Sequence, residues 1–172
     1  MPGAGHPGTY TLERTGDNTE TGEKMTKKAQ VTSYKTGDAL VCRLPHGTDL
    51  LEAVTEICVD EDISMAAVGG IGALNGVRFA YYDQEKRVYN EIERPGHFEI
   101  LSLIGNVSIK DGAPMCHAHI ICGDERGATF GGHLAKGCTV FACELVIIPL
   151  KGDPLVRGYD EETGLTLWGG DL

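Results

Sequence analysis

The chain has 172 residues, of which 41% are hydrophobic and 24 are glycines, and its formal net charge is −10. This length and composition indicate one turn-rich globular domain and exclude a fibrous or largely disordered chain. Residues 1–30 carry as many basic as acidic side chains, so the whole negative excess lies in the remainder and opposes tight binding to nucleic-acid phosphates.

The first 30 residues are rich in Gly, Thr, Glu and Pro and have no apolar periodicity. We therefore expect a disordered tail over residues 1–30 and a domain over residues 31–172. Met25 is a candidate for the true start, because it opens Met-Thr-Lys-Lys just before the first strand-like segment. No run approaches the ~20 apolar residues of a membrane span, and the N-terminus lacks a signal peptide's apolar core. The predicted location is the cytoplasm, with no membrane partner.

One helix is predicted in the chain. A strand over residues 39–44 is followed by Thr48 and Asp49, either of which is a suitable N-cap. Apolar residues then recur at helical spacing and would form one buried face over about three turns. These residues are Leu50, Leu51, Val54, Ile57 and Cys58.

The rest of the chain shows short strand patterns separated by turns. A strand over 63–68 is expected to end at the glycines of 69–72, and Gly105 is expected to form a bulge or bend between two further strands. Many strands with a single helix indicate an α+β domain with a mostly antiparallel sheet. The other predicted strands cover 77–82, 87–92, 98–104, 106–109, 117–122 and 139–148.

Six cysteines occur, mostly inside apolar runs, and none forms a Cys-x-x-Cys pair. The pattern favours buried, reduced thiols over disulfides, a redox motif or a zinc ribbon. Two of them, Cys116 and Cys122, flank a pair of histidines on the predicted strand 117–122.

The strongest chemical signal is His117-Ala118-His119, with His133 fourteen residues later. Positions i and i+2 of a strand share a face, so His117 and His119 would present two imidazoles side by side. A hairpin turn at Gly123–Gly127 could return His133 to them and complete a three-nitrogen site with one open position. Zinc is the natural ion, although nickel, copper or iron would also suit. The alternative is that all three are ordinary hydrogen-bonded surface, interface or turn histidines.

Strand alternation places Cys116 and Cys122 on the opposite face, which favours an all-histidine site. Among nearby acids, Asp124 and Glu125 belong to the predicted turn. Glu144 lies in an apolar run, where a buried carboxylate would need a partner, so it is a candidate for orienting a ligand or for transferring a proton.

An ordered series of motifs in this chain resembles the PPC domain, the plant and prokaryote conserved domain that accompanies AT-hooks in plant nuclear proteins. The resemblance covers about residues 35–150. Its motifs are Arg43-Leu44-Pro-His-Gly47-Thr-Asp49-Leu50, Gly70-Ile-Gly72-Ala-Leu, Gly96-His-Phe-Glu99-Ile-Leu-Ser-Leu103, His117-Ala-His119, Gly131-Gly132-His133-Leu134 and Glu144.

The resemblance implies a seven-stranded antiparallel sheet with one helix, assembled as a homotrimer, and zinc on His117, His119 and His133. It also implies contacts with other proteins through Gly96, His97, Phe98, Glu99, Ile100 and Leu101. Plant members bind AT-rich DNA through an Arg-Gly-Arg-Pro core, which is absent here, and His97 stands where they usually have arginine.

Three functional classes stay open. The resemblance implies a DNA-binding or regulatory protein with a three-histidine zinc site, and the acidic charge implies that DNA binding is weak. A zinc-dependent enzyme using the open metal position is the second class, although no catalytic residue is assigned. The third is a metal protein that binds a small ligand or a partner and has no affinity for DNA.

Overall fold

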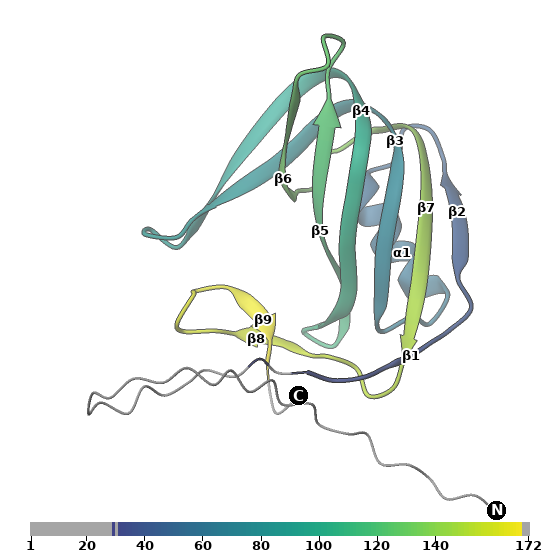
Figure 1. Cartoon of the computed structure of the whole chain (residues 1–172), viewed down its shortest axis with the longest axis vertical. Coiled ribbons are helices and arrows are strands. Elements are labelled where there is room, and N and C mark those ends of the chain that lie inside the picture. The colour runs from purple at the N-terminus through teal and green to yellow at the C-terminus, as the bar shows by residue number, and fades with distance from the viewer. Residues whose placement is uncertain (1–28, 30, 170–172) are drawn as a thin grey trace, which may run out of the picture.

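The computed structural model describes Ala29 and residues 31–169, so the predicted tail, apart from Ala29, and the candidate start Met25 lie outside the described residues (Figure 1). The described elements in chain order are β1 (Lys35–Thr36), β2 (Leu40–Leu44), α1 (Leu50–Asp60), β3 (Ala66–Asp83), β4 (Val88–Lys110), β5 (Ala113–Gly123), β6 (Thr129–Leu134), β7 (Val140–Lys151), β8 (Arg157–Tyr159) and β9 (Thr166–Trp168). The predicted α+β class, with one helix and a mostly antiparallel sheet, is confirmed.

Asp49 is the residue that starts α1. Its Oδ1 accepts hydrogen bonds from the backbone N–H groups of Leu51 and Glu52, both at 3.0 Å. Its Oδ2 accepts from the N–H groups of Gly137 and Cys138, just before β7. One side chain therefore caps the helix and ties it to the sheet, which satisfies N–H groups that a helix start leaves unpaired.

A seven-stranded antiparallel sheet forms the body of the molecule. Its strand order is β1-β7-β3-β4-β5-β6, with β2 also paired to β7. The sheet curls until β6 meets β3 again, where Phe79 lies opposite Leu134 and Ala80 opposite His133. In Figure 1, α1 lies behind this sheet. The helix side chains Leu50, Val54 and Cys58 join the core with the sheet's inner face.

The glycines at 69–72 do not end a strand, so that prediction is wrong. β3 runs through them, and at Gly70 and Gly72 a close neighbour rather than a turn requires the small residue. A Cβ at Gly70 would lie 2.5 Å from the Leu145 side chain. Gly105 is likewise not a bulge. It pairs regularly with Ala118, and a Cβ there would lie 2.5 Å from the His117 carbonyl oxygen.

Two hairpins project beyond the sheet. Beyond the pairing with β6, the end of β3 and the start of β4 extend together as an arm, defined here as residues 81–90, and β8 and β9 form a second hairpin below it (Figure 1). The two are tied together by hydrogen bonds from Tyr82 Oη to the Thr163 carbonyl at 2.8 Å and from the Arg87 guanidinium to two carbonyls of the β8–β9 loop. Among the described residues, no helix is long and apolar enough to cross a membrane.

Candidate metal centre

The sheet register brings the three predicted histidines together. His117 and His119 lie on β5, one residue apart, and His133 lies on β6 directly opposite His119. Residues that face each other in an antiparallel ladder point to the same side of the sheet. The three imidazoles therefore share the outer face, away from α1, as the i, i+2 spacing predicted.

A row of residues paired across neighbouring strands connects the histidine cluster with the rest of the outer face. The ladders pair Val146 with Gly69, Gly69 with Ile104, Ile104 with His119 and His119 with His133. Val146 and Ile104 are exposed at 43% and 69%. The histidine cluster is thus the end of a row that is otherwise apolar or small.

Two glycines allow β6 to approach closely enough to place His133. A Cβ on Gly131 would lie 2.0 Å from the Ile120 carbonyl oxygen, and a Cβ on Gly132 would lie 2.6 Å from the Ala80 carbonyl oxygen. Any larger residue would push β6 away from β5 or β3. Glycine, which has no Cβ, therefore lets the backbone of β6 approach its neighbours closely at this site.

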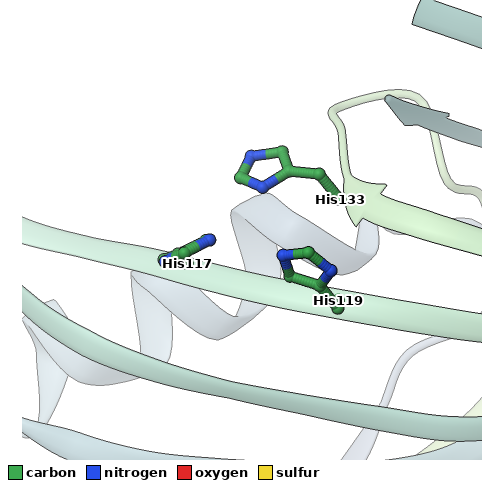
Figure 2. Close-up of side chains that lie close together, drawn as sticks. All are labelled: His117, His119 and His133. Carbon is green, nitrogen blue, oxygen red and sulfur yellow. The ribbon is translucent and has the colours of Figure 1, made fainter. Parts of the chain in front are cut away.

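The imidazole rings face one another across a small space (Figure 2). Ring centroids are 4.9 Å apart for His117 and His133, and 5.5 Å apart for each of the other two pairs. One nitrogen from each ring can be chosen so that all three lie within 4.8 Å of one another. Three imidazoles at this spacing could hold a divalent ion.

The electrostatics favour neutral rings. Burial, the nearby His133 and His119 rings and the Arg157 guanidinium lower the pKa of His117 to about 4. Burial, with His119 and Arg157, also lowers the pKa of His133. Metal ligation needs the neutral imidazole, so protons compete less for these two rings than for an exposed histidine.

His133 Nδ1 is buried and has no hydrogen-bond partner among the described residues. Burying a polar atom without a hydrogen-bond partner costs folding free energy. Such atoms therefore often mark stored strain, a catalytic role or a binding site for an ion or a water molecule. Its position within the cluster fits a nitrogen that binds a cation.

Side chains from the two projecting hairpins surround the cluster. The Tyr89 ring lies 4.8 Å from the His133 ring, centroid to centroid, and 4.9 Å from the Tyr82 ring. Arg157 of β8 is 7% exposed, and its Nη2 lies 3.4 Å from His117 Nδ1. Trp168 of β9 lies beside Arg157, whose Cζ is 5.5 Å from the indole centroid.

The cysteines beside the histidines do not join the cluster, as strand alternation predicted. Cys116 and Cys122 are buried on the inner face. Burial raises the pKa of their thiols to about 12 and about 11, so neither supplies a thiolate at neutral pH. All six cysteines are free.

The structure does not bring Glu144 to the histidines. It lies on β7, three strands from β5, which is roughly 14 Å at the usual strand spacing. It is also exposed, so the expectation of a buried carboxylate in need of a partner is wrong. Asp124 instead closes its own turn, accepting hydrogen bonds from the N–H groups of Arg126 and Ala128 at 2.9 Å.

The predicted contact segment, Gly96 to Leu101, lies on β4 at a distance from the histidines along the sheet. Ile100 is buried in the core, whereas Gly96, His97, Glu99 and Leu101 are exposed and Phe98 is half-buried. His97 Nδ1 and Asn75 Oδ1 are hydrogen-bonded at 2.9 Å. A surface cavity of about 450 Å³ opens here, lined in part by His97, Phe98, Glu99 and Phe141.

Sequence reasoning missed the residues that approach the cluster from other elements, above all Arg157 and Tyr89. Arg157 is 40 residues from His117 in the chain, and the short pattern around it carries no motif. Its position beside His117 becomes visible only in the structure, where the chain after β7 returns to the sheet as β8. No sequence signal indicated this position.

A family model described as the Plants and Prokaryotes Conserved (PCC) domain, here called PPC, matches residues 31–151. A metal-containing protein of Archaeoglobus fulgidus is 41% identical, over 83% of this chain and 100% of that chain, with a TM-score of 0.79. A plant- and prokaryote-conserved (PPC) protein of Pyrococcus horikoshii is 39% identical, over 82% and 98%, with a TM-score of 0.78.

A more distant solved structure, from Ralstonia eutropha, is that of a protein for which DNA binding has been suggested. It is 27% identical, over 75% of this chain and 89% of that chain, with a TM-score of 0.68. Among curated proteins, none matches this chain.

Proposed function

Because the chain belongs to the PPC domain family, we propose that it is a metal-binding member of that family, holding one divalent transition ion on His117, His119 and His133. The observation that carries this proposal is the cluster itself, in which one nitrogen from each of the three rings lies within 4.8 Å of the others. A similar protein described as metal-containing supports it.

The donor set favours zinc. Three neutral nitrogen ligands suit zinc, copper, nickel or iron better than calcium or magnesium, which prefer oxygen. Two observations fit a cation bound among these rings: His133 Nδ1 has no hydrogen-bond partner in the described part of the chain, and the pKa values of His117 and His133 are lowered. A three-histidine zinc leaves one position open and, when bound, supplies a Lewis acid.

Zinc titration of the metal-stripped protein tests this proposal. Calorimetry should show about one zinc per chain for the unchanged protein and no specific uptake for His119→Ala. His97→Ala is the matched control, because His97 is an exposed histidine outside the cluster. Equal zinc uptake by the His119→Ala and His97→Ala variants would contradict the site.

DNA binding is the second candidate, supported by the similar Ralstonia protein for which it has been suggested. The charge opposes it, since the net charge is −10 and residues 1–30 contribute nothing to that excess. We therefore propose that any DNA binding by the domain is weak and non-specific.

We further propose that the chain assembles as a homotrimer in the cytoplasm. The helix covers one face of the sheet, whereas the outer face exposes a set of large apolar side chains that a partner subunit would bury. They include Ile71, Ile104, Ile121, Val146 and Ile148. Because this set continues into the histidine row, we expect the metal site to lie near a subunit boundary.

The free cysteines support the proposed cytoplasmic location, since unpaired thiols are typical of a reducing compartment.

A partner protein would contact the exposed part of the segment Gly96 to Leu101. The cavity at Phe98 and Phe141 offers an apolar recess bordered by Glu99 and His97. An apolar side chain of the partner could enter this recess while polar groups around it contact Glu99 and His97, an arrangement that is common in protein interfaces.

A further inference from the structure

Arg157 is held rigidly beside the histidine cluster. Its Nε donates to Ser108 Oγ at 2.8 Å, its Nη2 to Asn106 Oδ1 at 2.7 Å, and its Nη1 to the Thr166 carbonyl at 3.1 Å. The segment before it is fixed to the sheet by a hydrogen bond from Ile109 N–H to the Leu155 carbonyl. The guanidinium is therefore a built part of the site.

No carboxylate of the described residues forms an ion pair with this guanidinium. Among the residues that the structure describes, the arginines and lysines in ion pairs are Arg78, Lys86, Arg126 and Lys136, and Arg157 is not one of them. Its partners are a hydroxyl, an amide oxygen, a carbonyl and the His117 ring nitrogen, all of them uncharged. In a chain with a large acidic excess, a buried positive charge without a counter-charge is unusual, because burying an unpaired charge is costly.

The metal site adds to this imbalance. The candidate ligands are three imidazoles and include no acidic side chain. A divalent ion among neutral rings, beside a guanidinium that stays protonated at neutral pH, would give a local charge of about three positive units. An anion bound there would reduce the repulsion and occupy the open metal position at once.

We infer that the site formed by His117, His119, His133 and Arg157 binds a small carboxylate, held jointly by the metal ion and the Arg157 guanidinium. This inference rests on the proposed metal site. Guanidinium and carboxylate match in geometry, and hydrogen bonds between them are about twice as strong as neutral ones. Three of the five N–H groups of Arg157 are committed to the contacts above, and a fourth, on Nη2, faces His117 Nδ1 at 3.4 Å. One N–H group on Nη1 remains for a ligand.

The walls of the site favour a planar monoanion over phosphate. The aromatic rings of Tyr89 and Trp168 lie against His133 and Arg157 respectively and offer flat, apolar surfaces. The acidic surroundings also repel a dianion more strongly than a monoanion. His119 is the exposed member of the cluster, so a ligand would enter on its side.

Cobalt substitution allows a direct test, because the visible absorption of cobalt reports its ligands. Acetate added to the cobalt-loaded protein should change the spectrum, whereas acetamide, a neutral molecule of the same shape, should not. Arg157→Gln should keep the cobalt bands and weaken acetate binding by about tenfold or more, as expected for a lost charged hydrogen bond. Arg126→Gln, which changes an exposed arginine, is the matched control and should leave acetate binding unchanged.

Equal responses to acetate and acetamide, tighter binding of inorganic phosphate than of acetate, or an unchanged acetate midpoint in Arg157→Gln would overturn the carboxylate assignment while leaving the metal site intact. The first two comparisons use the unchanged protein, so they decide the question even if Arg157→Gln does not fold. Absence of cobalt bands in the unchanged protein would overturn the metal site and the carboxylate assignment together.

Discussion

His119 on β5 lies directly opposite His133 on β6, with their ring centroids 5.5 Å apart. This pairing joins a His-x-His pair on one strand to a third imidazole on its neighbour. The tight turn after Gly123 fixes the register, because a slip of one residue would move His133 to the other face of the sheet. The geometry of the site is therefore a property of one hairpin.

Gly131, two residues before His133, provides a test of the hairpin. Gly131→Ala should lower the free energy of unfolding by about 1–3 kcal/mol, the usual cost of overpacking, because its Cβ would lie 2.0 Å from the Ile120 carbonyl oxygen. It should also weaken zinc binding by displacing β6. Urea unfolding and zinc titration measure the two effects.

Gly69→Ala is the matched control, since its Cβ would have no neighbour closer than 3.8 Å. Equal stability and equal zinc affinity in the two variants would show that close approach at Gly131 does not build the site.

The sequence predicted the site better than it predicted the strands that carry it. Alternation within residues 117–122 placed two imidazoles together and the two cysteines away from them, because period-two geometry is local. Gly70, Gly72 and Gly105 misled the strand prediction, since the sequence does not distinguish a glycine required by a close neighbour from a glycine in a turn. Arg157 could not be predicted, because its approach to His117 depends on how β8 docks after the chain leaves β7.

The metal-free protein should lose stability in acid through His117. Its pKa is lowered from 6.5 to about 4 in the folded protein, chiefly by burial. The unfolded chain thus binds the proton more tightly, so the free energy of unfolding falls as the pH drops from about 6.5 to about 4 and is constant below that. Since the ring is half-buried, solvent screening should limit the loss to about 1–2 kcal/mol.

Urea unfolding of the metal-free protein at several pH values measures this loss. His117→Gln should show a shallower dependence than the unchanged protein across that window. His97→Gln, at an exposed histidine, serves as the comparison. An identical pH dependence in all three proteins would contradict the prediction.

The exposed outer face leads to a prediction about assembly. Light scattering of the unchanged protein should give the mass of a trimer, because a single helix leaves this face of the sheet uncovered. Ile104→Asp should shift the mass toward the monomer by placing a charge in the middle of that face. Val59→Asp, at an exposed apolar residue on the helix, should leave the trimer unchanged. A monomer mass for the unchanged protein at micromolar concentration would refute the assembly.

Binding to AT-rich duplex DNA should be weak, with a dissociation constant in or above the micromolar range at physiological salt, as is usual for non-specific contacts. The reason is the acidic excess outside residues 1–30. Fluorescence anisotropy over a series of salt concentrations measures this affinity. A nanomolar complex that resists salt would show that the domain recognises DNA, and loss of that complex on removing residues 1–30 would assign it to the tail.

Elemental analysis of the protein, purified without a histidine tag, tests the central claim most directly. We predict about one transition-metal ion per chain, with zinc the main species. Cys122→Ala should retain it, because Cys122 is buried on the opposite face, whereas the His117→Ala/His119→Ala double variant should contain none. Full metal content in that double variant would contradict the account.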